Sequence, residues 1–199
     1  MTSAGSGSTP EHDEVEVKVP CRDLSEVRRR LEADGASRLT ARHFESNDLY
    51  DDPEKRLSSQ GRTVRLRRAA GRAILTYKGK ARFQGGIKSR EERETEVTDP
   101  VETEGILAGI GLARRFRYEK YREEWRFMEC TIALDETPIG RFVEVEGDPP
   151  AIRRVLETLG LDFSSALPYS YARLYMQRRQ EEPSLPADMV FPSREGGEP

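Results

Sequence analysis

Charged side chains of one kind recur at every second position in several short segments of the sequence. Glu14 and Glu16 alternate with valines, and Arg65 and Arg67 stand on either side of Leu66 in the same way. Successive side chains of a β-strand point to opposite faces, so each segment predicts a strand with one apolar and one charged face. Rows of carboxylates collect hard divalent cations, and lysine and arginine collect phosphate oxygens. The pattern therefore indicates binding of a polyanion together with a metal ion.

Two arrangements would produce this alternation. The charged faces could be the solvated outside of a sheet, with cross-strand ion pairs that each contribute only about a few tenths of a kcal/mol. Like charges on one face, however, lie about 6–7 Å apart and repel unless cations neutralise them. The second arrangement closes the strands into a barrel around a charged lumen. Its inward candidates are the acids Glu14, Glu16, Glu92, Glu94, Glu96, Asp135, Glu144 and Glu146 and the bases Lys18, Arg65, Arg67, Lys78, Arg90, Lys120 and Arg122.

The helices and strands that must position these side chains are predicted from helix-capping residues and from the spacing of apolar residues. Helices are predicted after Asp23 and at Asp99-Pro100 and Asp148-Pro149, because aspartate caps a helix and proline suits its first turn. The second of these helices is expected to bury Ile106, Leu107 and Ile110. A fourth helix is predicted around 169–179. Strands are predicted at about 12–20, 38–50, 62–70, 73–80, 88–98, 114–128, 130–136 and 140–147.

Composition limits the class of protein. Net charge is −3, from 33 basic and 36 acidic residues among 199, which argues against a globally basic nucleic-acid binder. No run of about 18 apolar residues and no signal peptide is visible. Two cysteines, Cys21 and Cys130, are too few for a disulfide scaffold, so a cytoplasmic protein is expected, with their pairing left open. We expect one folded domain at 11–182 between disordered tails at 1–10 and 183–199.

An ordered set of motifs resembles a known family. The segment Glu14-Val15-Glu16-Val17-Lys18 matches the ExExK signature of the CYTH domain, the fold of the triphosphate tunnel metalloenzymes. The resemblance extends over about 12–175 and implies an α+β fold, an eight-stranded antiparallel closed β-barrel with amphipathic helices outside. The supporting motifs are Leu49–Pro53, Val64–Arg67, Leu75–Lys80, Arg90–Glu96, Tyr118–Arg122, Leu134–Glu136, Gly140–Gly147 and Ser170–Leu174.

The resemblance also implies roles for the charged residues. Lys18, Glu14 and Glu16 would form the catalytic group, and Lys18 would act either as a base or simply as a phosphate ligand. Mg²⁺ or Mn²⁺ would be bound by Glu14, Glu16, Glu92, Glu94, Asp135, Glu144 and Glu146. The triphosphate would be bound by Lys18, Arg65, Arg67, Lys78, Arg90, Lys120 and Arg122.

Two reactions fit such a site. Hydrolysis of a triphosphate needs only the groups named above, whereas the class IV adenylate cyclase reaction also needs an adenine pocket, and no short segment specifies one. We therefore favour a metal-dependent triphosphatase, with cyclisation of ATP as the alternative and a non-catalytic phosphate or nucleotide sensor as a second. The expected partner is a small-molecule triphosphate or nucleoside triphosphate, with no stable nucleic-acid or membrane binding. The resemblance also allows a homodimer. The two histidines, His12 and His43, are not spaced in the sequence as a pair of metal ligands would be.

Overall fold

The computed structural model describes residues 13–192. The predicted tail at 1–10, His12 and residues 193–199 of the predicted C-terminal tail lie outside the described residues. The described strands are β1 (Asp13–Cys21), β2 (Ser37–Asp51), β3 (Thr63–Ala69), β4 (Arg72–Lys78), β5 (Arg82–Gln84), β6 (Ile87–Val97), β7 (Ala113–Phe127), β8 (Cys130–Thr137) and β9 (Gly140–Glu146). The described helices are α1 (Leu24–Ala33), α2 (Arg56–Ser59), α3 (Pro100–Gly109), α4 (Pro149–Thr158) and α5 (Tyr171–Glu181), with a 3₁₀ turn at Phe163–Ser165.

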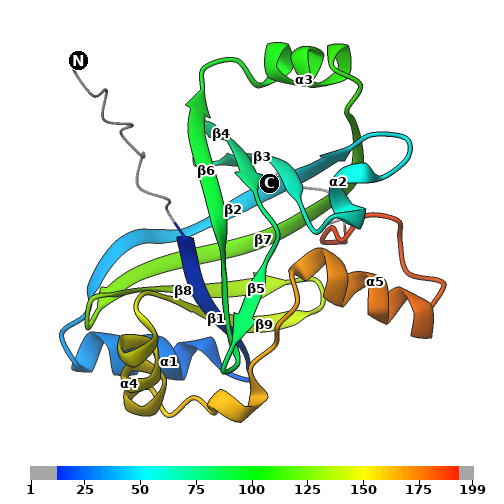
Figure 1. Cartoon of the computed structure of the whole chain (residues 1–199). Helices are drawn as coiled ribbons and strands as arrows, with labels where there is room; N and C mark the ends of the chain where they lie inside the picture. The colour runs from blue at the N-terminus through cyan, green and yellow to red at the C-terminus, as the bar shows by residue number, and fades with distance from the viewer. Residues whose placement is uncertain (1–12, 193–199) are drawn as a thin grey trace, which may run out of the picture.

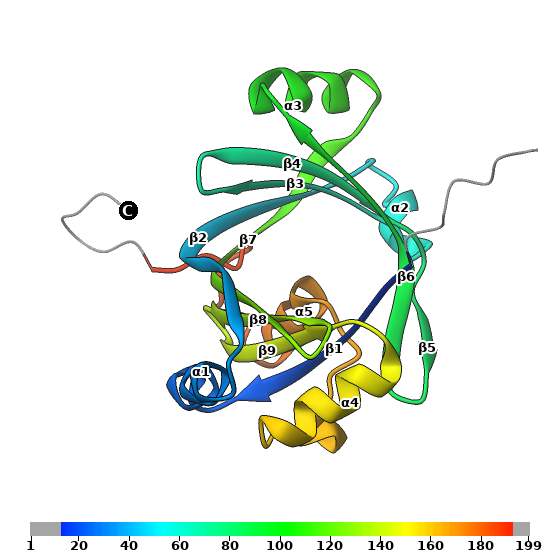
Figure 2. The same ribbon diagram turned by 90° about the vertical axis from the view of Figure 1, so that its left-hand side faces the viewer.

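The strands form a closed antiparallel barrel (Figures 1 and 2). Their order is β1-β9-β8-β7-β2-β3-β4-β6, and pairing of β1 with β6 completes the ring. The short strand β5 continues the line of β4 along the same edge of β6. The predicted eight-stranded barrel is thus confirmed, and closure leaves few free edges for unwanted pairing.

The largest apolar core lies outside the barrel wall, between the strands and two helices. Valines of β1 and β9 that alternate with the charged residues pack against α1 and α4 (Figures 1 and 2). Asp23 caps α1 by accepting a hydrogen bond from the backbone N–H of Ser25, as the capping pattern predicts. Leu31 on α1 and Ile152 on α4 are fully buried, and each such side chain contributes about 1.5–3 kcal/mol. The alternation therefore places apolar side chains outward and charged side chains inward.

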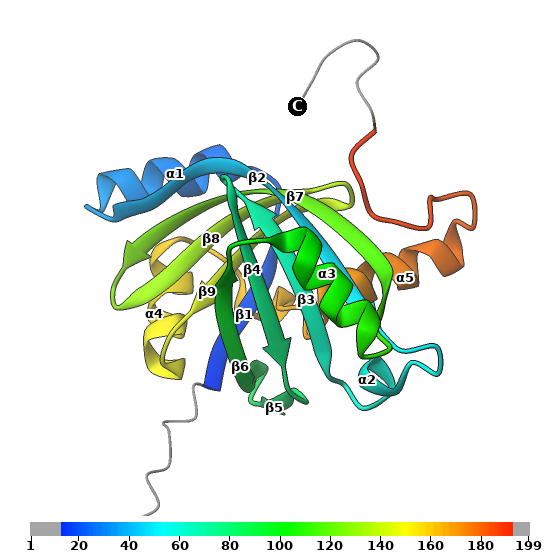
Figure 3. The same ribbon diagram turned by 90° about the horizontal axis from the view of Figure 1, so that it is seen from above.

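Helix α3 departs from the predicted packing. Only Leu107 of the predicted apolar face is buried, while Ile106 and Ile110 are 65% and 68% exposed. The helix lies across the outer side of β3 and β4 (Figures 1 and 3) and meets a small apolar cluster that includes Leu66 and Ala73. Because this cluster is narrow, one helical position covers it. The prediction that Ile106 and Ile110 are buried was wrong.

Helix α5 and the segment after it close one end of the barrel. Tyr171 and Tyr175 of α5 pack in an aromatic cluster with the β7 residues Phe116 and Tyr118. Met189 is fully buried in the same cluster. We call residues 183–192, which follow α5, the C-terminal strap.

The C-terminal strap is tied to the part of β7 that β8 does not cover. The backbone N–H of Met189 donates to Arg117 O, and Glu119 N–H donates to Met189 O, both at 2.9 Å. Composition predicts a disordered tail from residue 183, but strand β8 ends before this stretch of β7. The free backbone groups of β7 therefore bind the strap, a long-range pairing that composition does not reveal.

The structure also bears on the helices, the two cysteines and the Leu49–Pro53 motif. Within residues 13–192, no helix combines the length and apolar character needed to cross a membrane. Cys21 and Cys130 are both free thiols in this structure. The Leu49–Pro53 motif has a local role, because the carboxylate of Asp51 accepts hydrogen bonds from the backbone N–H groups of Leu57 and Ser58 at the start of α2.

Candidate functional site

A cavity of about 390 Å³ lies inside the barrel. Most of its lining is charged, and it receives side chains from β1, β2, β3, β4, β6, β7 and β9 and from the start of α5. The eight basic lining residues are Lys18, Arg65, Arg67, Lys78, Lys88, Arg90, Lys120 and Arg122. The seven acidic lining residues are Glu14, Glu16, Glu92, Glu94, Glu124, Glu144 and Glu146. Strand alternation therefore concentrates both signs of charge in one enclosed volume.

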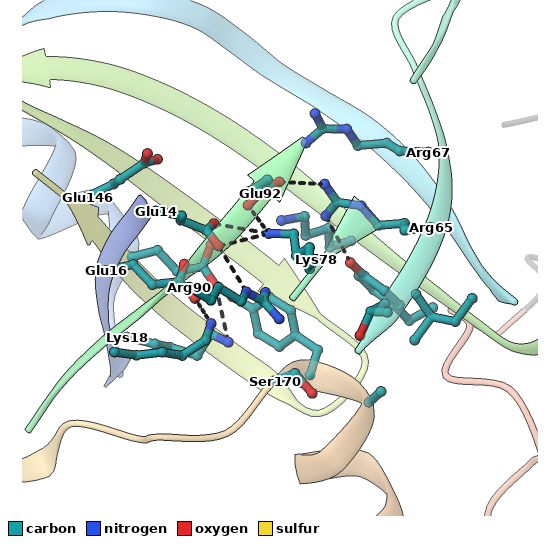
Figure 4. A pocket seen from close by; sticks show the side chains of 18 of the residues that line it. Glu14, Glu16, Lys18, Arg65, Arg67, Lys78, Arg90, Glu92, Glu146 and Ser170 are labelled. Atoms are coloured by element: carbon teal, nitrogen blue, oxygen red, sulfur yellow. Dashed lines mark hydrogen bonds and ion pairs between the residues drawn. The ribbon is translucent and has the colours of Figure 1, made fainter. Parts of the chain in front are cut away.

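One group of ion pairs surrounds Glu14 (Figure 4). Lys78 Nζ donates to both oxygens of Glu14 at 3.0 and 3.1 Å, and Arg90 Nε donates to Glu14 Oε2 at 3.1 Å. Lys78 also lies 2.5 Å from Glu92 Oε2. Three strands, β1, β4 and β6, thus bring two cations and two carboxylates together.

The two carboxyl groups of this group, Glu14 and Glu92, have pKa values shifted in opposite directions. Burial by itself raises the pKa of Glu14, but Lys78 and a hydrogen bond with Glu92 lower it well below its ordinary value. Burial, followed by that same hydrogen bond, raises the pKa of Glu92 to about 8. A carboxyl group that keeps its proton near neutral pH beside an ionised one is a typical result of two acids in one small space. A divalent cation would take the place of this proton.

A second acidic group lies where β1 meets β6 and β9. Glu16 pairs with Lys88 across the barrel wall and lies opposite Glu146 in the register of β1 and β9. Within the described part of the chain, Glu146 has no ion pair, and it stands apart from the other labelled side chains in Figure 4. Burial, then the charges of Glu14 and Glu16, raise the pKa of Glu146. This uncompensated negative charge favours a cation.

Arginines cover the wall formed by β3 and β4. Arg65 Nη2 donates to Glu94 Oε1 at 2.9 Å and to the hydroxyl of Thr76 at 3.1 Å. Its Nη1 donates to the phenol oxygen of Tyr118 at 3.4 Å. Arg67 lies 3.6 Å from Glu94 and has a buried Nε without a hydrogen-bond partner. Guanidinium groups with donors still free suit the bidentate binding of phosphate oxygens.

Asp135 does not reach the cavity. Its carboxylate is fully buried behind the lining, where Arg122 donates to both oxygens at 2.8 and 2.6 Å. Lys120 Nζ and the Tyr171 hydroxyl donate to Oδ2 at 3.1 and 2.7 Å. Asp135 was predicted as a metal ligand, but here its oxygens are occupied by the cations that line the tunnel. Glu96, a weaker inward candidate, pairs instead with Arg72 at an exposed end of β6.

The remaining predicted residues all line the cavity, and the structure adds others. Lys88 and Glu124 lie two residues from Arg90 and Arg122 on the same strands, and therefore on the same inward face. The alternation rule that selects Arg90 and Arg122 also selects these two residues. Glu45 lies behind the lining, 3.5 Å from Lys120 and 3.8 Å from Arg67, and these cations lower its pKa despite burial. The uncharged lining residues are Leu49, Thr63, Tyr118, Ser170, Tyr171 and Ala172.

The donor set is chemically suited to a hard cation. Carboxylate oxygens are the ligands that Mg²⁺ prefers, and it needs only one or two of them directly. In the described residues, no three acidic, histidine or cysteine side chains converge closely enough to hold an ion as they stand, because most are paired with lysine or arginine. The buried Glu92 Oε2 lacks a hydrogen-bond partner, although Lys78 Nζ lies 2.5 Å away. The carboxylates of the lumen therefore fit a metal ion, provided that it displaces the lysine and arginine side chains that pair with them.

A closed antiparallel barrel with a lumen of lysine, arginine and glutamate is a tunnel whose charges suit a polyanion together with a cation. The CYTH domain profile matches residues 12–190, nearly all of the described chain. This chain belongs to the CYTH family. No protein with a curated description matches it significantly.

Solved structures share the fold. A putative adenylate cyclase from Vibrio parahaemolyticus superposes with a TM-score of 0.71 at 21% identity, covering 82% of this chain and 97% of that one. A Pyrococcus horikoshii protein gives 0.69 at 24% identity, covering 83% and 99%. A putative adenylyl cyclase from Hippeastrum, described as having a dominant triphosphatase activity, gives 0.61 at 17% identity, covering 83% and 96%. Identities this low establish the common fold, and CYTH membership establishes triphosphate processing at the level of the family.

Proposed function

We propose that this protein is a divalent-metal-dependent triphosphatase that binds a linear triphosphate in the barrel and releases orthophosphate. The observation that carries the proposal is the cavity itself, with eight lysine and arginine side chains facing seven carboxylates. A triphosphate carries about four negative charges at neutral pH, and phosphoryl transfer is mainly positioning and charge neutralisation. A lumen that receives cations from β1, β3, β4, β6 and β7 supplies both.

The charged residues of the lumen fall into two groups, one that would bind metal and one that would bind phosphate. Glu14, Glu16, Glu92, Glu94, Glu144 and Glu146 would hold Mg²⁺ or Mn²⁺, which when bound supplies a Lewis acid for the phosphoryl oxygens. Lys18, Arg65, Arg67, Lys78, Arg90, Lys120 and Arg122 would bind the phosphates, together with Lys88. Asp135 would hold Lys120 and Arg122 in place from behind. A water molecule attacks the terminal phosphorus, the bond to the bridging oxygen breaks, and diphosphate leaves.

The uncharged lining supports hydrolysis over cyclisation. An adenine ring needs a free aromatic or apolar face, and Tyr118 and Tyr171 are the aromatic residues of the lining. Lys18 Nζ lies 3.8 Å above the ring of Tyr171. Tyr118 packs against Phe116 and Tyr171, with ring centroids 6.4 and 6.1 Å away. Both rings are therefore already engaged by other side chains.

Cyclisation of ATP remains the second candidate because of the named structural neighbours. The Vibrio protein is a putative adenylate cyclase, and the Hippeastrum protein is a putative adenylyl cyclase with dominant triphosphatase activity. In that reaction the ribose 3′-hydroxyl attacks the α-phosphorus and pyrophosphate leaves. The same cations would bind the phosphates, so the products decide between the two.

The test is product analysis with the purified chain, Mg²⁺ or Mn²⁺, and either inorganic triphosphate or ATP. We expect orthophosphate from triphosphate, little cyclic AMP from ATP, and loss of turnover with a chelator. Cyclic AMP with pyrophosphate as the main products would replace the proposal with the cyclase. Tight triphosphate binding without any turnover would replace it with a phosphate sensor.

Two substitutions give this test a matched pair. Glu16→Gln removes a lumen carboxylate and should lower turnover by about 10²-fold or more, because metal ligands act directly on the transition state. Glu136→Gln removes a carboxylate on the outside of β8, where Glu136 is 41% exposed and pairs with Arg42. It should leave turnover unchanged. Equal loss in both variants would argue against a metal site in the lumen.

A further inference from the structure

The ammonium group of Lys18 is enclosed by three acceptors. Its Nζ lies 3.1 Å from Glu144 Oε1 and donates to the backbone carbonyl of Tyr169 at 3.1 Å. The third neighbour is the ring face of Tyr171, with the centroid 3.8 Å away. Because a lysine ammonium has three N–H donors, these groups occupy all of them. Two of the three come from the start of α5, about 150 residues further along the chain.

The start of α5 is itself held firmly against the barrel. Tyr171 donates its hydroxyl to the buried Asp135 at 2.7 Å, and its ring meets Phe142 edge-on at 5.3 Å. The backbone N–H of Leu167 donates to the carbonyl oxygen of Lys18 at 2.8 Å. The ring of Tyr171 is therefore fixed from the side of the barrel, and it presents its face to Lys18 inside the cavity.

The three acceptors differ in how readily they can leave. Glu144 is a lumen carboxylate that also pairs with Arg122 and would be required by a bound cation. The carbonyl of Tyr169 belongs to the backbone and the ring of Tyr171 is 5% exposed, so neither is free to move. A phosphate oxygen that reaches Lys18 thus takes the position of Glu144, and the other two contacts remain.

We propose that Tyr171 is a positioning residue, whose ring holds the Lys18 ammonium at the tunnel wall while triphosphate replaces Glu144. This inference rests on the proposed function, since it concerns how the same site binds its substrate. It also assigns Lys18 the role of phosphate ligand, because an ammonium held on three sides by acceptors is suited to binding anions.

The test is a double-mutant cycle on the affinity of the full chain for a non-hydrolysable imido analogue of triphosphate with Mg²⁺, measured by calorimetry so that turnover does not consume the ligand. Tyr171→Met keeps an apolar side chain of similar length but removes the ring, and should weaken binding about tenfold. In the Lys18→Ala background the same change should alter the affinity by less than about twofold, because the partner of the ring is gone. Tyr171→Phe keeps the ring and should stay within about threefold of the wild type.

A control on the same helix separates positioning from packing. Tyr175 lies one turn later in the same aromatic cluster and its hydroxyl donates to backbone carbonyls of the C-terminal strap. Tyr175→Met should change the affinity by the same factor with and without Lys18. An equal effect of Tyr171→Met in both backgrounds would overturn the inference, as would a Tyr171→Phe variant as weak as Tyr171→Met.

Two further results keep the inference separate from the proposed function. A wild-type chain that does not bind triphosphate contradicts the proposed function, whereas binding without coupling between Tyr171 and Lys18 contradicts the inference alone. If Tyr171→Met does not fold, the ε-methylene protons of Lys18 in the wild type and in Tyr171→Phe provide the test. An upfield ring-current shift that triphosphate preserves supports the inference, and normal chemical shifts overturn it.

Discussion

Replacing Asp135 with asparagine tests whether this residue anchors tunnel cations or binds metal. Asparagine keeps the shape and can still accept the hydrogen bond from Tyr171, so the change removes mainly the negative charge. Lys120 and Arg122 would lose their shared buried partner. Removing one side of a buried ion pair destabilises a protein by about 3–5 kcal/mol.

The remaining contacts place the expected value at the lower end of that range. Lys120 keeps Glu45 at 3.5 Å, and Arg122 keeps Glu144. We therefore expect the free energy of unfolding to fall by about 3 kcal/mol, which lowers Tm by about 6–12 °C for a chain of this size. The assay is thermal and urea unfolding of the metal-free protein near pH 7.

The neighbouring residue provides the control. Glu136→Gln removes a carboxylate at the next position of β8 on the outer face, where its pair with Arg42 is exposed, so Tm should change by about 2 °C or less. If Asp135→Asn leaves the metal-free Tm within that same margin and instead weakens Mg²⁺ binding, Asp135 is a metal ligand and the anchoring role is refuted.

Three further predictions concern the lumen, the outer wall and α3. Burial and a neighbouring carboxylate raise the pKa of Glu92 to about 8, and its proton must leave before a cation binds, so Mg²⁺ affinity should increase about 20-fold from about pH 6.5 to 8.5. Asp48→Asn removes a fully buried carboxylate that pairs with three arginines outside the lumen, and should destabilise the fold by about 3 kcal/mol without changing KM. Leu107→Ala should lower stability by about 2–3 kcal/mol, whereas Ile106→Ala should change it by less than about 0.5 kcal/mol.

Each of these predictions has a direct check. Calorimetry of Glu92→Gln with Mg²⁺ should show a flatter pH dependence than the wild type, and an equally steep one would assign the proton to another group. Urea unfolding with steady-state kinetics separates stability from substrate binding in Asp48→Asn, and a raised KM would show that the outer network shapes the lumen. Equal unfolding midpoints for Leu107→Ala and Ile106→Ala would contradict the orientation of α3.

The barrel and most of its lumen could be predicted from the sequence because alternation is a local property. In a strand, the alternation of side chains alone assigns each residue to one face, so the sequence predicts that Glu14, Arg65 and Lys120 share the charged face of their strands. The same rule, applied one step further, assigns Lys88 and Glu124. Closure of the barrel makes one face of each strand the inner face. Because amphipathic helices must cover the apolar faces from outside, the charged faces line the lumen.

The features that the sequence does not reveal involve contacts between distant parts of the chain. Asp135 has inward parity, but Tyr171 reaches it from 36 residues away and separates it from the cavity. The helical period of α3 could not show which of Ile106, Leu107 and Ile110 meets the sheet, because the apolar cluster beneath is narrow. Met189 is buried only because β7 extends beyond β8. The burial of each of these residues depends on the lengths of the strands and on which helix or segment packs beside them. The type of the residue alone does not determine either.

Most of the charged side chains in the lumen of this structure are paired with one another. Lys18 binds Glu144, Lys78 binds Glu14 and Glu92, and Arg65 binds Glu94. A triphosphate that displaced these carboxylates from the cations would leave several uncompensated negative charges in a partly buried space, where repulsion is strong. A cation alone would likewise leave lysine and arginine without partners. Each ligand therefore removes the electrostatic penalty that the other creates, so triphosphate and metal should bind cooperatively to this tunnel.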